Sequence, residues 1–257
     1  MRLETHRWGA EEADAVVCLH GLNQNGRVFE PLGKRLAEGG RSVISVDLRG
    51  HGGSGIDPPW SIETHVADLL ETLAELGVRS AALVGHSFGA RVAATAAAQD
   101  GDLVARLALL DPGLQVSPAR ALRAAEIERR DWSFASVEAG VRAVMANELT
   151  VATPEAIVVK FAEEDMREGP DGRLRFGCCP STVVTGWSEM TLPPPPIARV
   201  PTLIVCAATP LVDGDEQQRR YEDALGELLS IVEVPNGHNV MWESPAETIA
   251  AIERFLG

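Results

Sequence analysis

Short apolar runs recur along the chain, and the segments between them show helical periodicity. The runs are four to seven residues long and mostly lack polar alternation, at residues 15–19, 42–46, 81–84, 107–110, 202–207 and 230–234. Such runs are typical of strands that are buried on both faces of a parallel sheet. A further strand is expected within residues 2–8, at an antiparallel edge of the sheet.

A helical pattern fills the gaps between these runs. In residues 63–76, the side chains of Val66, Leu69, Leu70 and Leu73 fall on one face of a helix. Strands that alternate with helices imply right-handed crossovers and a doubly wound sheet. The chain is therefore predicted to have an α/β fold built on a mostly parallel sheet.

The alternation breaks between about residues 114 and 190. Three helical candidates follow one another there without strands between them, at residues 118–130, 136–149 and 154–167. Four consecutive prolines at 193–196 predict a stiff extended connector back to the next strand. We expect residues 114–190 to form a helical cap inserted into a core made of residues 1–113 and 191–257.

The cap is expected to supply the walls of a pocket. Its large apolar residues are mainly expected in the cap's own core, with some facing the pocket: Trp132, Phe134, Met145, Phe161, Trp187 and Met190. Three arginines are candidates for a substrate carboxylate, namely Arg123, Arg142 and Arg175. Trp242 is expected either to pack near the candidate base described below or to anchor the last helix.

Composition narrows the classes of partner. A chain of 257 residues with 45% hydrophobic residues is ordinary for a soluble globular protein. The net charge of −14 argues against nucleic acid or an anionic membrane surface as a binding partner, because both would be repelled. No apolar run reaches eighteen residues, and residues 1–6 do not resemble a signal peptide. Four cysteines fit no metal-ligand spacing, since Cys178 and Cys179 are adjacent. We expect a cytoplasmic protein that needs no metal or cofactor.

Residues 85–89, Gly-His-Ser-Phe-Gly, carry the strongest chemical signal. A strand-like run precedes them and an alanine-rich helical segment follows, which is the setting in which a G-x-S-x-G sequence exposes a nucleophilic serine. The glycines permit a close turn, and the helix directs its amino end at Ser87. Ser87 is therefore the candidate nucleophile.

A serine nucleophile needs a base and donors for the oxyanion. His238 follows the last predicted strand, at the same sheet edge as Ser87, and is the candidate base. The turn after residues 15–19 can present the backbone N–H of Leu22, which with the N–H of Phe88 predicts an oxyanion hole. His20 is expected to support that turn rather than act as a base.

Four ordered motifs resemble the α/β-hydrolase family over essentially the whole chain. They are His20-Gly21, residues 47–54 (Asp-Leu-Arg-Gly-His-Gly-Gly-Ser), residues 85–89 and Gly237-His238. The resemblance implies the α/β-hydrolase fold and an esterase-like triad in which an acid orients the histidine. Serine at position 87 argues against the branches of this family that carry aspartate there.

The acid departs from the common family pattern. Thr209 stands where the resemblance leads one to expect aspartate, and threonine cannot supply a negative charge. Asp111 ends the strand after the serine strand at the same sheet edge, a position from which some family branches draw their acid. Asp213 lies four residues beyond Thr209 and is the alternative. We favour Asp111 because a strand end orients a side chain better than a loop does.

These residues predict a serine hydrolase that cleaves a small-to-medium ester or lactone through an acyl-enzyme. A carbon–carbon bond hydrolase and a non-hydrolytic lyase on the same fold are the alternatives, with a non-catalytic binding protein as a further class. The expected partner is a small acyl compound, and neither nucleic acid nor membrane.

Overall fold

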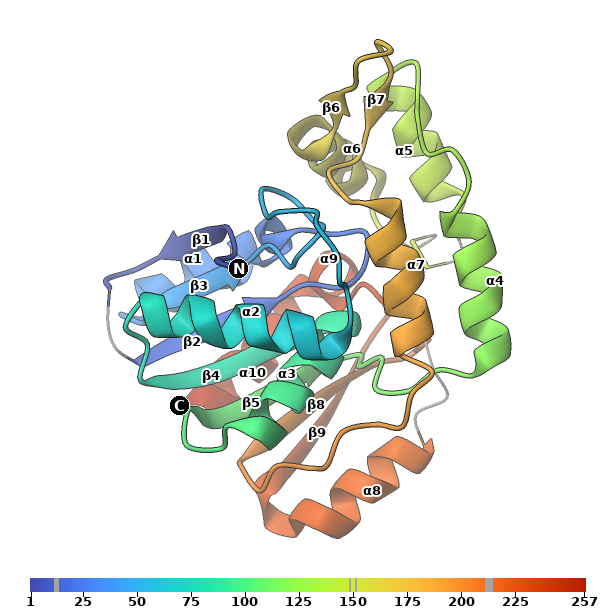
Figure 1. The fold of residues 1–257 in the computed structure, drawn as a ribbon. Helices are drawn as coiled ribbons and strands as arrows, with labels where there is room; N and C mark the ends of the chain where they lie inside the picture. Colours follow the sequence, from blue (N-terminus) through green and yellow to red (C-terminus); the bar gives the residue numbers. More distant parts are fainter. Residues whose placement is uncertain (12–13, 148, 151, 211–214) are drawn as a thin grey trace.

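A seven-stranded sheet forms the centre of the molecule (Figure 1). The computed structural model describes residues 1–11, 14–147, 149–150, 152–210 and 215–257. The strand order is β1-β3-β2-β4-β5-β8-β9, and every neighbouring pair is parallel except β1 with β3. The strands are β1 (Thr5–Trp8), β2 (Asp14–Leu19), β3 (Val43–Val46), β4 (Ser80–His86), β5 (Val104–Leu110), β8 (Thr202–Ala207) and β9 (Leu229–Val234). The predicted, mostly parallel sheet with an antiparallel edge is confirmed.

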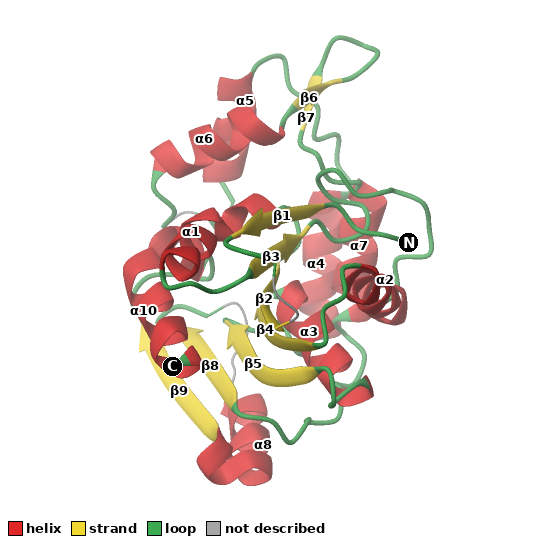
Figure 2. Cartoon of the chain, turned by 90° about the vertical axis from the view of Figure 1, so that its left-hand side faces the viewer, coloured by secondary structure: helices red, strands yellow, loops and turns green. Residues whose placement is uncertain are grey.

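Helices cover both faces of this sheet, as Figure 2 shows. On one face, α1 (Glu30–Glu38) and α10 (Pro245–Leu256) bury Leu32, Leu36 and Ile252 against apolar strand residues. On the other face lie α2 (Ile62–Glu75) and α3 (Phe88–Gln99), and α8 (Asp215–Leu225) adds Tyr221 to the same core. The shorter elements are η1 (Gly26–Phe29), η2 (Gly226–Leu228) and α9 (Val240–Glu243). Among the described helices, none is both long and apolar enough to cross a membrane.

Strand β5 begins three residues before the predicted run, at Val104. Arg106 interrupts the apolar pattern within it, which is why the sequence predicts a shorter strand. In the structure its guanidinium lies 5.6 Å from the centre of the Phe255 ring and donates to the Phe255 carbonyl at 3.1 Å. The arginine is thus accommodated against α10 by its stem and a cation–π contact.

Residues 114–190, which we call the insertion, lie between β5 and β8. The three predicted helices are present as α4 (Pro118–Glu128), α5 (Val137–Met145) and α6 (Glu155–Asp165). Each ends earlier than predicted, and α5 and α6 also begin one residue later. The sequence did not predict the small hairpin of β6 (Arg167–Glu168) and β7 (Leu174–Arg175), nor α7 (Pro180–Glu189). Val141, Val158, Ala162 and Met166 form a small core of the insertion's own. Its assignment as a separate cap domain stays a prediction.

One buried arginine holds both ends of the insertion. Arg91 on α3 is 4% exposed and donates to the carbonyl of Leu114 and, at 2.6 Å, to that of Pro193. These two carbonyls lie where the chain leaves the sheet and where it returns. The contacts fix the insertion beside the carboxyl ends of the strands, where the predicted site residues lie.

Candidate active site

Ser87 occupies a strained turn between β4 and α3. Its backbone angles are φ 53° and ψ −115°, a region that residues with a side chain seldom adopt. The neighbouring backbone leaves no space on either side: a Cβ on Gly89 would lie 2.2 Å from the Leu19 carbonyl oxygen, and one on Gly85 would lie 2.5 Å from that of Gly89. The turn thus requires glycine at both positions.

Hydrogen bonds from neighbouring strand ends hold this turn. The N–H of Ser87 donates to the Leu110 carbonyl at 3.0 Å, and the N–H of Gly113 donates to the Ser87 carbonyl at 3.1 Å. The turn places the Ser87 side chain at the carboxyl edge of the sheet. This is the strand–turn–helix setting that the sequence motif predicts.

The structure brings together the three residues that the sequence singled out for the triad. His238 Nε2 lies 2.9 Å from Ser87 Oγ, and His238 Nδ1 lies 2.5 Å from Asp111 Oδ2. The three side chains are 4–7% exposed, and they come from the ends of β4, β5 and β9. Parallel strands place their carboxyl ends at one edge, so residues far apart in sequence meet there.

Asp111 is fixed on both sides of its carboxylate. Its backbone has φ 35°, its N–H donates to the Val205 carbonyl at 2.7 Å, and its Oδ1 accepts the N–H of Ala207 at 3.1 Å. Thr209, at the position usual for the acid, is exposed, and its N–H donates to the Asn236 carbonyl. Asp213, the alternative acid, lies outside the described residues.

The predicted oxyanion donors border the same edge. In the loops and turns that the structure describes, the N–H groups of Leu22 and Phe88 have no acceptor, and Phe88 is the first residue of α3. The Leu22 turn is held by Gln24, whose Oε1 accepts the N–H of Gly21 at 3.1 Å. Leu22 also lines the cavity that opens onto Ser87, and the role of these two amides as oxyanion donors stays a prediction.

Two buried histidines support this region. His20 Nε2 accepts the N–H of Leu48 at 2.9 Å, so its Nδ1–H donates to the Gly21 carbonyl at 2.8 Å. Burial lowers the pKa of His20 to about 4, so it is neutral and structural, as the sequence predicts. His86 contacts the Gln24 side chain and the His238 carbonyl, and burial holds the pKa of its imidazole well below the usual range.

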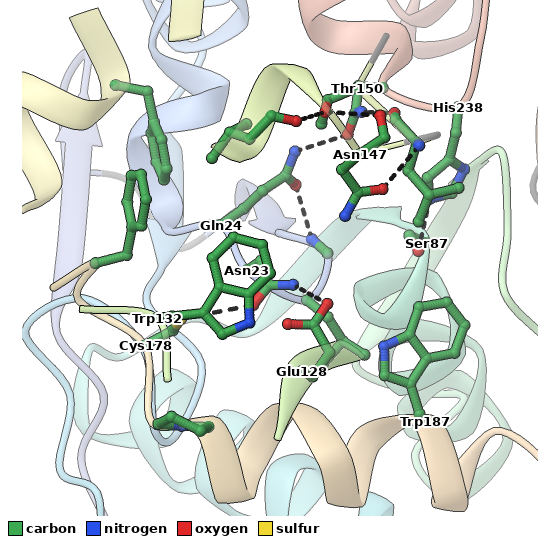
Figure 3. A pocket seen from close by; sticks show the side chains of 18 of the residues that line it. Asn23, Gln24, Ser87, Glu128, Trp132, Asn147, Thr150, Cys178, Trp187 and His238 are labelled. Carbon is green, nitrogen blue, oxygen red and sulfur yellow. Dashed lines mark hydrogen bonds between the residues drawn. The ribbon is translucent and has the colours of Figure 1, made fainter. Parts of the chain in front are cut away.

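A cavity of about 250 Å³ opens onto Ser87 and His238, between the sheet edge and the insertion (Figure 3). Three of the six predicted apolar residues line it, namely Trp132, Phe161 and Trp187, as does Trp242. Phe134 and Met145 instead pack in the insertion's own core. The lining also holds polar groups: Asn23, Gln24, Glu128, Asn147, Thr150 and Asn239.

Of the three arginines predicted as candidates for binding a substrate carboxylate, one lines the cavity. Among the three candidates, Arg175 lines it, but both its terminal nitrogens donate to the Asp171 carboxylate at 2.8 Å. Arg123 and Arg142 are not among the lining residues. Within the described chain, no three His, Cys, Asp or Glu side chains gather as a metal site would require.

Sequence reasoning missed Glu128, a carboxylate that faces this cavity. It lies seven residues after Ala121 and four after Ala124, so it shares the inward face of α4 with them. That spacing is a signal that the sequence contains.

Comparisons with known proteins agree with the fold. A family model described as "Alpha/beta hydrolase family" matches residues 16–252. Lipase LipV of Mycobacterium tuberculosis is 28% identical over 258 residues, covering 99% of this chain and 98% of its own. The 2-(acetamidomethylene)succinate hydrolase of Mesorhizobium japonicum is 32% identical, covering 94% of this chain and 87% of its own.

Solved structures show the same architecture. A crystal structure of E-2-(acetamidomethylene)succinate hydrolase superposes with a TM-score of 0.84 at 27% identity, covering 99% of this chain and 94% of that one. The enol-lactonase of Burkholderia xenovorans LB400 has the same fold, with a TM-score of 0.78 at 20% identity, covering 99% of this chain and 96% of its own. The family match over most of the chain and these relatives lead to one conclusion: the chain belongs to the alpha/beta hydrolase family.

Proposed function

We propose that this chain is a serine hydrolase that cleaves a small-to-medium ester or lactone through an acyl-enzyme on Ser87. The observation that supports it most directly is the unbroken set of contacts from Asp111 through His238 to Ser87 Oγ, which ends at the cavity. A volume of about 250 Å³ suits a compact acyl group better than a large lipid. The lipase and enol-lactonase named above are consistent with acyl chemistry.

The proposed first step is attack of Ser87 Oγ on the substrate carbonyl. The Asp111 carboxylate accepts the Nδ1–H of His238, which leaves Nε2 unprotonated and able to take the serine proton. The imidazolium that forms is stabilised by the negative charge of Asp111. The carbonyl oxygen becomes an oxyanion, for which the N–H groups of Leu22 and Phe88 are the donors.

The tetrahedral intermediate then collapses. The bond to the leaving oxygen breaks, His238 returns its proton to that oxygen, and the acyl group stays on Ser87. Water, deprotonated by His238, attacks the ester of Ser87, and the same donors receive the second oxyanion. Release of the acid regenerates the free serine, so the cycle consumes one water and needs no cofactor.

The experiment is a panel of p-nitrophenyl esters of graded chain length, simple lactones and a vinylogous diketone, with Ser87→Ala as the blank. The proposal expects turnover of short esters or lactones that is lost in the variant. It also expects a fluorophosphonate adduct on the peptide that carries Ser87. Turnover of the diketone alone favours the carbon–carbon hydrolase, and labelling without ester turnover favours the lyase.

A further inference from the structure

A buried carboxylate faces the cavity and has no charged partner among the residues that the structure describes. Glu128, the last residue of α4, is 8% exposed and lines the cavity that contains Ser87. One of its oxygens accepts the side-chain N–H of Asn23 at 2.7 Å. Asn23 directly follows Leu22, so Glu128 is attached to the loop that carries a proposed oxyanion donor. Figure 3 shows this contact beside Trp132.

Nothing in the described chain compensates the charge of Glu128. It forms no ion pair among the described residues, and burial raises its pKa above the usual value while the Asn23 contact opposes that rise. Arg130 and Arg175 also line the cavity, but Arg175 is held by Asp171, and Arg130 is exposed and has no ion pair with Glu128 among the described residues. Because an unpaired buried carboxylate is costly, its presence at a ligand cavity indicates a partner supplied by the ligand.

A second polar group at the same cavity has no partner. Trp187 on α7 is 4% exposed, and its indole Nε1–H is buried without an acceptor among the described residues. Figure 3 shows the nitrogen-bearing edge of Trp187 turned toward the side of Glu128. The lining residues therefore include an acceptor on α4 and, on α7, an indole whose donor is unused among the described residues, both on the insertion.

We propose that Glu128 and Trp187 bind the part of the substrate remote from the scissile carbonyl, and that this part carries an uncharged amide or hydroxyl group. Such a group donates to the Glu128 carboxylate and accepts from the Trp187 indole. A carboxylate at that place is excluded, because it meets a like charge in a site with low dielectric. This inference rests on the proposed acyl chemistry at Ser87 and names its substrate class.

The test uses esters of one shape that differ in charge. Mono-p-nitrophenyl esters of adipic, pimelic and suberic acid carry a terminal carboxylate, and the matching primary amides replace it by an uncharged isostere. p-Nitrophenyl heptanoate is the apolar reference. For the length that reaches Glu128, the wild-type protein is expected to prefer the amide by at least about tenfold in kcat/KM.

Two variants assign this preference to the two residues. Glu128→Gln keeps the shape and the contact with Asn23, and it is expected to reduce the amide-to-carboxylate ratio to about threefold or less. Glu126→Gln, on the same helix but exposed, is the matched control and should leave the ratio unchanged. Trp187→Phe removes the donor and should lower the preference for the amide over heptanoate by about three- to tenfold.

The inference is overturned if the carboxylate ester is used as well as the amide at every length, or if Glu128→Gln leaves the ratio as it was. If Glu128→Gln does not fold, the wild-type ratio and the Trp187→Phe variant still decide. Failure of the proposed function looks different, because Ser87→Ala would then retain turnover of all these esters.

Discussion

Replacing Asp111 by asparagine tests the acid that orients His238. Asparagine has the same shape as aspartate but only one oxygen and no charge. The expected result is a protein that folds normally and has lost most of its kcat. The substitution separates the geometry of the site from its electrostatics, because the space filled by the side chain does not change.

The first part of the loss follows from the hydrogen bonds. Asp111 Oδ1 accepts the N–H of Ala207 at 3.1 Å, while Oδ2 faces His238 Nδ1 at 2.5 Å. An asparagine whose oxygen faces Nδ1 turns its NH2 group against the Ala207 N–H, which costs about 1–3 kcal/mol. In the other orientation the NH2 donates to Nδ1, the ring proton moves to Nε2, and the Ser87 proton has no acceptor.

The second part is the lost charge. A carboxylate and an imidazolium roughly 4 Å apart attract each other by about 4 kcal/mol at an effective dielectric constant of 20. This attraction acts only when His238 is protonated, so its loss raises the barrier. Together the two contributions amount to about 5–7 kcal/mol, or a decrease in kcat of about 10⁴–10⁵-fold.

The assay is kcat for the best p-nitrophenyl ester, with the melting temperature as the check on folding. Asp213→Asn is the comparison, because Asp213 is the alternative acid, and it is expected to keep near wild-type kcat. The reasoning is refuted if Asp111→Asn stays within about tenfold of wild type while Asp213→Asn loses several hundredfold.

Three further predictions concern stability. Burial opposes ionisation of Asp47, but hydrogen bonds from His6 and two backbone amides outweigh it and lower its pKa to about 2. The resulting stability is present above the unfolded pKa and is lost as the pH falls through about 2. Asp47→Asn should therefore cost about 2 kcal/mol in urea unfolding at pH 7 and about half as much near pH 3; an equal loss at both pH values would contradict this. Gly89→Ala should lower the free energy of unfolding by about 3 kcal/mol or more, because the added methyl group would lie 2.2 and 2.5 Å from two backbone carbonyl oxygens. Gly101→Ala is the control: the nearest atom to its methyl group would be 3.9 Å away, so this variant should melt near the wild-type temperature. Burial raises the pKa of Glu128, so the folded protein loses stability as the pH rises through that pKa. The free energy of unfolding of Glu128→Gln should therefore increase relative to that of the wild type between about pH 4 and pH 7. A difference that does not change with pH would refute the burial argument.

Much of the site could be predicted because it depends on strand ends. Ser87, Asp111 and His238 each follow an apolar run, and a parallel sheet brings the ends of its strands to one edge. Thr209 stands where the family resemblance leads one to expect the acid, and threonine carries no charge, which leaves Asp111 as a candidate at the neighbouring strand end. The strands follow from local apolar patterns, whereas Ser87 needed the G-x-S-x-G motif and the triad needed the resemblance to the α/β-hydrolase family.

The rest depended on contacts that have no local pattern. Asn23 and Glu128 are 105 residues apart, and their contact requires α4 to lie over the loop after β2. Helix α7 has Pro180 at its first turn, but its residues carry mixed polarity because it packs against α4 and the main core while Pro180 and Trp187 line the cavity. The small hairpin of β6 and β7 has only two residues in each strand, too few for periodicity to be visible.

The most direct measurement is the turnover of a short p-nitrophenyl ester by Ser87→Ala, beside a wild-type sample prepared in the same way and with matching melting temperatures. If Ser87 is the nucleophile, kcat falls by about 10³-fold or more, because the base, the acid and the oxyanion donors have no oxygen to activate. Retention of more than about a tenth of the wild-type kcat would show that the ester is cleaved without an acyl-enzyme on Ser87.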